Sequence, residues 1–182
     1  QAQKSVCPQC RQKIPTSQKD GVKQLRVWVD KGKPWAQTLL ANKSQFGDGV
    51  LQSYEETIKY FNMAIKQGDP NAMYQLAAMY EHGQGVAQSF KTATELYALA
   101  ANQGHARAQY NLGDIYEFGK GVAQSCEKAF ELYTLAANQG NADAQFNLAC
   151  LYYNGRGVAQ SNDKARKWCL KAALQEDETA IK

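Results

Sequence analysis

The residues with the clearest chemical potential are Cys7 and Cys10, which lie in the segment C-P-Q-C-R-Q-K-I-P near the start of the chain. Two thiolates at this spacing can bind one zinc ion, but a closed tetrahedral site needs four ligands. No histidine or further cysteine lies nearby in the sequence to complete the set. The sequence therefore predicts no metal site within this chain, and no motif in it calls for a cofactor.

This segment resembles the closing segment of a RING finger, with a proline inside the cysteine pair and Arg11 directly after it. The resemblance implies that Cys7 and Cys10 are the last two zinc ligands of such a finger, with the six earlier ligands upstream of this chain. It also implies that Pro8 contacts a ubiquitin-conjugating enzyme and that Arg11 stabilises the ubiquitin-charged complex. A flexible, cysteine-containing arm is the alternative interpretation.

The other cysteines and the histidines do not form a catalytic pattern. Cys126, Cys150 and Cys169 are irregularly spaced, which favours reduced thiols in an intracellular, cytoplasmic protein. A cysteine nucleophile needs a histidine partner, but His82 and His105 fall in loops, where we expect solvated side chains. Serine-hydrolase, zinc-protease and phosphate-loop motifs are absent. The sequence thus predicts a protein that is not an enzyme, unless a complete RING lies upstream.

Charge and hydropathy restrict the partners further. The chain has 182 residues and a net charge of +4. Residues 1–50 hold nine Lys/Arg against three Asp/Glu, but these basic residues are scattered and not interleaved with aromatic residues, so we expect no nucleic-acid partner. No apolar run approaches the roughly 18–20 residues that span a bilayer. Because the chain begins at Gln1 without a methionine, an organelle-targeting leader upstream remains an open alternative.

A repeated segment organises most of the chain. Gln139–Ser161 is a third copy of a pattern that also occupies Gln67–Ser89 and Gln103–Ser125, with a spacing of 36 residues each time (103 − 67 and 139 − 103). A fixed period of this size indicates an array of stacked repeats, in which each unit buries its apolar face against its neighbours.

Each repeat is expected to form two short helices. In the middle copy these are predicted over residues 91–102 and 106–118, closed by Gly104 and Gly119, with Ser125 as the N-cap of the next helix. Residues of the same type recur three and four positions apart and predict the buried face. On the first helices they are Thr57/Ala93/Ala129/Ala165, Tyr60/Leu96/Leu132/Trp168, Phe61/Tyr97/Tyr133/Cys169 and Ala64/Ala100/Ala136/Ala172; on the second they are Ala72/Ala108/Ala144, Leu76/Leu112/Leu148 and Tyr80/Tyr116/Tyr152.

The glycine pair, the valine and the alanines of this pattern resemble the Sel-one-like repeat, a relative of the tetratricopeptide repeat. The resemblance is clear over residues 54–161 and weaker on either side. It implies an all-α fold, a right-handed α-solenoid of stacked helix-turn-helix repeats, and a function as an adaptor or scaffold for protein complexes. The implied divisions are an N-terminal arm (1–17), a degenerate capping repeat (18–53), repeats at 54–89, 90–125 and 126–161, and a terminal half-repeat (162–182).

The candidate binding residues form a second stripe beside the core stripe of the first helices. Residue type varies along this stripe, so packing does not dictate it, and the first helices of stacked pairs line the concave side. The stripe consists of Ile58, Asn62, Lys66, Thr94, Ala98, Asn102, Phe130, Thr134, Asn138, Arg166 and Leu170. The main interpretation is a scaffold that binds a protein in this groove or is a subunit of a larger assembly. The alternative is the substrate-recruiting part of a RING-type ubiquitin ligase, with a ubiquitin-conjugating enzyme as partner.

Overall fold

The structure, a computed structural model, describes the backbone of residues 18–180 and the side chains of residues 21–175. Within that range every regular element is an α-helix, which confirms the predicted all-α class. The arm at residues 1–17, with Cys7 and Cys10, lies outside the described residues. The chain divides into two compact units, Gln1–Ala72 and Met73–Lys182.

The first unit contains α1 (Gln18–Asp30), α2 (Pro34–Phe46) and α3 (Tyr54–Ile65). Helix α2 packs against both α1 and α3. The core between them is apolar and consists of Val22, Leu25, Val29, Ala36, Leu40, Ala41, Tyr60, Phe61 and Ala64. The buried amide of Gln37 accepts a hydrogen bond of 2.9 Å from Gln67 Nε2, so its oxygen is satisfied.

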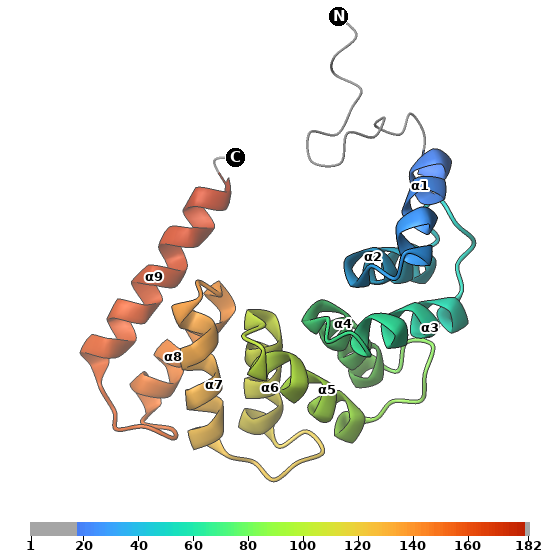
Figure 1. Ribbon diagram of the computed structural model, residues 1–182. Helices are drawn as coiled ribbons and strands as arrows, with labels where there is room; N and C mark the ends of the chain where they lie inside the picture. The colour runs from blue at the N-terminus through green and yellow to red at the C-terminus, as the bar shows by residue number, and fades with distance from the viewer. Residues whose placement is uncertain (1–17, 181–182) are drawn as a thin grey trace, which may run out of the picture. The chain divides into compact units, whose positions relative to one another are not determined.

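The second unit contains most of α4 (Pro70–His82), then α5 (Phe90–Asn102), α6 (Ala106–Phe118), α7 (Cys126–Asn138), α8 (Ala142–Asn154) and α9 (Asn162–Ala180). Helices α5 to α8 are two pairs of equal length that repeat every 36 residues. Each helix of this unit packs against the next one along the chain from α5 to α9 (Figure 1). The predicted bounds of α6 are confirmed, and α5 begins one residue earlier than predicted.

The recurring tail of each repeat, V-A-Q-S (V-L-Q-S at residues 50–53), connects two helices. Its serine is the N-cap of the following helix and accepts a backbone N–H three residues on, as Ser89 does from Thr92 at 3.2 Å. Its glutamine donates to the backbone of the preceding second helix. The four equivalent bonds, 2.7–3.0 Å long, join Gln52 to Gln45 O, Gln88 to Glu81 O, Gln124 to Glu117 O and Gln160 to Tyr153 O.

The second glycine of each repeat loop allows a close backbone approach. Gly157 has φ = +68°, and a Cβ built there would lie 2.3 Å from the carbonyl carbon and oxygen of Cys126. Gly121, one repeat earlier, has φ = +71° and would place a Cβ 2.6 Å from Cβ of Phe90. In these two repeats the loop after the second helix therefore packs directly on the start of the first helix of the same repeat, at a distance that only glycine permits.

Most of the predicted core is confirmed. Ala93, Tyr97, Ala100 and their counterparts Ala129, Tyr133 and Ala136 are fully buried. The prediction is wrong for Cys169, which is exposed although it lies at the same repeat position as Tyr97 and Tyr133. Its side chain is too short to reach across to α8 as the tyrosine rings reach across to their neighbours.

His105 is not the solvated loop residue that the sequence suggested. It is the N-cap of α6, where Nδ1 accepts a hydrogen bond of 3.1 Å from the backbone N–H of Ala108. Its ring also stacks on Tyr74, with ring centroids 4.7 Å apart. The repeat comparison pointed to this function, because Asn141 lies at the same position and caps α8 in the same way.

Candidate interaction surface

A buried carboxylate links successive repeats of the second unit. The hydroxyl of Tyr97 donates to Glu81 Oε2 at 2.8 Å, and the hydroxyl of Tyr133 donates to Glu117 Oε2 at the same distance. Burial raises the pKa of both tyrosines well above their ordinary value, so the phenols stay neutral and act as donors. Each bond joins a first helix to the second helix of the repeat before it.

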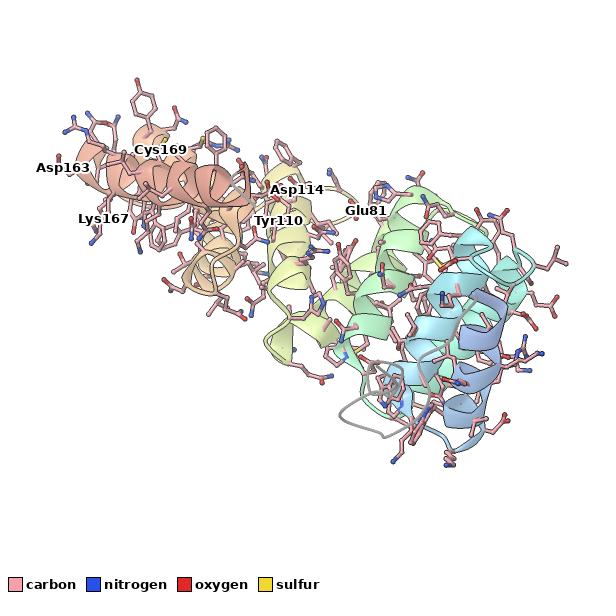
Figure 2. All side chains as sticks on the ribbon, turned by 90° about the horizontal axis from the view of Figure 1, so that it is seen from above. Glu81, Tyr110, Asp114, Asp163, Lys167 and Cys169 are labelled. Carbon is pink, nitrogen blue, oxygen red and sulfur yellow. The ribbon has the colours of Figure 1, made fainter. Side chains whose placement is uncertain are left out.

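A basic residue from the glycine loop of the following repeat lies beside each of these carboxylates. Arg156 Nη1 lies 2.9 Å from Glu117 Oε1, and its second nitrogen contacts Cys126 Sγ at 3.6 Å. That contact, more than the charge of Glu117, raises the pKa of Arg156. Lys120 Nζ lies 4.0 Å from Glu81 Oε1 and 2.5 Å from Asp114 Oδ2. Figure 2 labels the two carboxylates, Glu81 and Asp114.

These glutamates connect successive repeats of the second unit. Both are buried and already hydrogen-bonded to a phenol and paired with a cation. Our sequence interpretation missed this network. The signal was present, because Glu81 and Glu117 are 36 residues apart and so are Lys120 and Arg156.

The described residues offer no metal centre. None of their histidine, cysteine, aspartate and glutamate side chains gather in groups of three or more that could hold an ion. Cys126, Cys150 and Cys169 are free thiols. Burial raises the pKa of the Cys150 thiol, which favours its neutral form.

Part of the predicted binding stripe serves packing. Phe130 is half-buried, packs against the core of its repeat, and meets Tyr152 edge to face at 5.4 Å between ring centroids. Thr94 and Thr134 each donate a hydrogen bond of 2.7 Å to the carbonyl four residues back in their own helix. Ile58 and Ala98 are half-buried.

The remaining stripe residues are exposed. In the first unit these are Asn62 and Lys66, and in the second they are Asn102, Asn138, Arg166 and Leu170. The structure therefore leaves the amides and charges of the stripe open to solvent, and directs its largest ring, Phe130, toward the core.

The outer face of α5 and α7 carries exposed leucines and glutamates that the sequence interpretation missed, beside two asparagines of the predicted stripe. Leu99 and Leu135 are 50% and 51% exposed and lie one repeat apart. Each has an exposed amide three residues after it and an exposed glutamate four residues before it. We call this set the outer ladder: Glu95, Leu99 and Asn102 on α5, and Glu131, Leu135 and Asn138 on α7.

The helical pairs, the glycine loops and the buried tyrosines define an α-helical repeat protein. The Sel1 repeat model matches four successive segments, residues 36–69, 70–105, 106–141 and 142–177. The chain belongs to the Sel1 repeat family, which confirms the resemblance found in the sequence. No curated protein sequence matches it.

Solved structures of the same repeat class superpose on most of the chain. A Sel1 repeat protein from Oxalobacter formigenes is 31% identical, with a TM-score of 0.84 over 89% of this chain and 66% of that one. The protective antigen c5321 of uropathogenic Escherichia coli, which has the SLR fold, is also 31% identical, with a TM-score of 0.82 over 90% of this chain. This chain spans about a third (34%) of the length of c5321.

The fold alone is shared with a more distant protein, the cysteine-rich protein B of Helicobacter pylori. The two chains are 19% identical, with a TM-score of 0.59 over 71% of this chain and 96% of that one. Among the described helices of this chain, none is long and apolar enough to cross a membrane.

Proposed function

We propose that this chain is a protein-interaction scaffold and that its partner contacts the outer ladder on α5 and α7. Membership of the Sel1 repeat family supports a scaffold, because these repeats serve protein–protein contacts and the fold is typically not catalytic. The state of the buried glutamates agrees with this, since each accepts a hydrogen bond from a tyrosine and lies within ion-pair distance of a cation.

The observation that carries the proposal is the recurrence of an exposed leucine in register. A single exposed leucine is ordinary on a protein surface. Leu99 and Leu135, however, occupy the same position in two repeats, and neither is needed by the core. Repeated apolar residues beside amides and charges are typical of a protein interface, in which a few apolar side chains carry most of the binding energy.

The neighbouring residues indicate the chemistry of the partner. Glu95 and Glu131 are exposed, and neither forms an ion pair within the described residues. Asn102 and Asn138 present amides that can donate to and accept from a peptide backbone. A partner segment with apolar side chains and nearby basic residues fits this surface. Binding on the concave side, and a place in a larger assembly, stay predictions.

The test is site-specific photo-crosslinking from single positions. A photoreactive residue at Leu99 or Leu135 should give the same discrete adduct in native extract, because the proposal assigns both positions to one partner. Ala87 and Ala123 are matched controls, since they are also exposed and also one repeat apart, but lie in the loops. Equal adducts from the loop positions, or none from the leucines, would exclude the outer ladder as the binding surface.

The ubiquitin-ligase alternative has no support beyond the sequence segment that suggested it. Cys7, Pro8, Cys10 and Arg11 lie outside the described residues, and the family match begins at residue 36. No observation on the described residues favours it over the scaffold.

A further inference from the structure

The seam between each first helix and the second helix before it is filled by an aromatic ring in three repeats. Phe61, Tyr97 and Tyr133 occupy one repeat position, and all three are fully buried. The fourth residue at this position is Cys169 on α9, which is exposed. A cysteine side chain is much smaller than a phenyl ring, so α9 leaves unfilled the volume that the rings fill in the earlier repeats.

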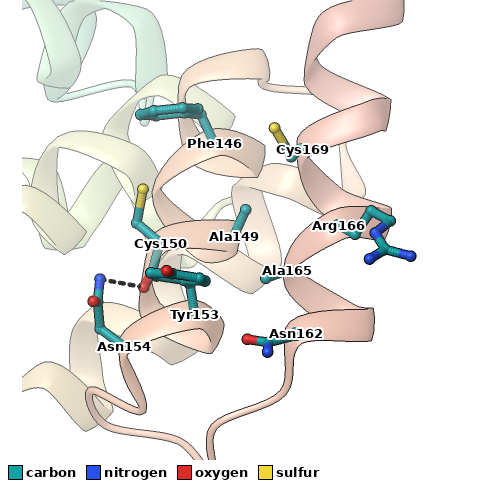
Figure 3. A pocket seen from close by; sticks show the side chains of 9 residues that line it. All are labelled: Phe146, Ala149, Cys150, Tyr153, Asn154, Asn162, Ala165, Arg166 and Cys169. Carbon is teal, nitrogen blue, oxygen red and sulfur yellow. Dashed lines mark hydrogen bonds between the residues drawn. The ribbon is translucent and has the colours of Figure 1, made fainter.

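A hollow of about 430 Å³ lies at that place, between α8 and α9 (Figure 3). Three of its lining residues stand 36 positions after the residues that surround Tyr133. Tyr110 is 5.8 Å from the Tyr133 ring, Gly113 lies under its edge, and Glu117 accepts from its hydroxyl. Their counterparts in the hollow are Phe146, Ala149 and Tyr153. The hollow therefore continues a series of seams that the chain itself fills with rings.

The lining of the hollow lacks the carboxylates that lie near Tyr133. The glutamate that accepts the phenol is replaced by Tyr153, and Asp114 is replaced by Cys150. No carboxylate lines this hollow, so none can accept a hydrogen bond from a hydroxyl group there. Burying a hydroxyl without a partner is costly, so this seam suits a phenyl ring better than a phenol.

Two amides stand at the mouth of the hollow. The Asn162 side chain, on the first residue of α9, extends toward the gap between the helices (Figure 3). Asn154, the last residue of α8, also lines the hollow. Asn154 Nδ2 donates to Cys150 O at 2.9 Å, which leaves its side-chain oxygen available. Such amides can bind the backbone on either side of an inserted side chain.

From these observations we infer that the hollow between α8 and α9 binds the phenylalanine side chain of a partner polypeptide. The ring takes the place that Tyr133 takes one repeat earlier, and Asn154 and Asn162 bind the partner's backbone. Residues 1–20 and 176–182, whose side chains the structure does not describe, contain no aromatic residue that could supply this ring. This site is separate from the outer ladder, so either proposal can fail without the other.

The test uses N-acetyl-phenylalaninamide, with the tyrosine and alanine amides as comparison probes, and follows backbone amide shifts by NMR. The phenylalanine probe should shift residues of α8 and α9 around the hollow in a saturable way. The tyrosine probe should bind roughly tenfold more weakly because its hydroxyl has no buried acceptor. Equal shifts from the alanine probe, or tighter binding of the tyrosine probe, would overturn the inference.

Variants that fill the hollow give the second part of the test. Cys169→Phe restores a ring at the position of Phe61 without adding a hydroxyl, and should abolish binding while keeping or raising the melting temperature. Ala149→Leu should block the same volume from the α8 wall. The control is Lys167→Phe, an exposed position on the same helix that does not line the hollow. Unchanged binding in both blocked variants would overturn the inference.

Toluene and sedimentation measurements distinguish a partner polypeptide from other occupants. Toluene supplies the ring without a backbone, so it should bind more weakly than the peptide-like probe, and Asn162→Ala should remove that difference. If toluene binds as tightly, the site takes free aromatic molecules and the polypeptide assignment is wrong. If the parent chain forms a dimer that Cys169→Phe dissociates, the occupant is a second copy and the assignment is again wrong.

Discussion

Replacing Tyr133 with alanine should lower the free energy of unfolding of the chain by about 4 kcal/mol. The ring is fully buried in the seam between α6 and α7 and leaves a cavity when it is removed. The change also deletes the hydroxyl that donates to Glu117, a buried carboxylate. Arg156 still pairs with that carboxylate, which limits the additional cost.

Tyr133→Phe is the matched control, because it keeps the ring and removes only the hydroxyl. It should cost about 1–2 kcal/mol, through the loss of one hydrogen bond to a charged acceptor. Chemical denaturation of both variants gives the comparison. If the alanine variant is no less stable than the phenylalanine variant, the ring does not fill the seam and this description of the repeat interface is wrong.

Gly157→Ala should lower the free energy of unfolding by about 3 kcal/mol, through two separate costs. Its φ of +68° is strained for any residue with a Cβ, at about 1–2 kcal/mol. The new Cβ would also lie 2.3 Å from backbone atoms of Cys126, so the loop or the start of α7 must move. Such overpacking adds about 1–3 kcal/mol.

Gly104→Ala separates these two costs. Gly104 has φ = +83°, but a Cβ built there meets nothing within 4 Å. This variant should therefore lose only the conformational part, about 1 kcal/mol. Thermal or denaturant unfolding of the two variants measures the difference. Equal losses would mean that the close approach to Cys126 is relieved without cost.

Much of the fold could be predicted from the sequence because the same local pattern of caps, glycines and apolar residues occurs in each repeat. Ser125 as the N-cap of α7 and the bounds of α6 both came from one repeated pattern. Glycines at fixed places end the helices because they alone accept a left-handed backbone cheaply. Three consistent copies made these predictions secure, and tertiary contacts did not override them.

The wrong predictions came from the assumption that residues at the same repeat position have the same surroundings in every repeat. Cys169 shares its position with Tyr97 and Tyr133, but a short side chain at that position leaves a hollow where the rings fill the seam. Phe130 lies in a variable stripe, yet its ring reaches back to Tyr152. Variation along a stripe therefore does not by itself separate packing residues from binding residues.

The two leucines of the outer ladder were missed for a different reason. Leu99 and Leu135 recur one repeat apart, but the sequence analysis considered only the recurring residues of the buried stripes. The two leucines lie on another face of the helix, because each follows Tyr97 or Tyr133 by two residues, which corresponds to about 200° around a helix. A helical-wheel comparison of all repeated positions would have found them on the outer face.

The most direct test of the scaffold proposal is the affinity of the crosslinked partner, purified and titrated calorimetrically against matched variants. The double variant Leu99→Asp/Leu135→Asp should bind at least about a hundredfold more weakly than the parent chain, because two apolar anchors are lost. The control Ala87→Asp/Ala123→Asp adds the same charge in the loops and should bind as the parent does. If the leucine variant folds normally and binds within twofold of the parent, the outer ladder is not the partner's binding surface.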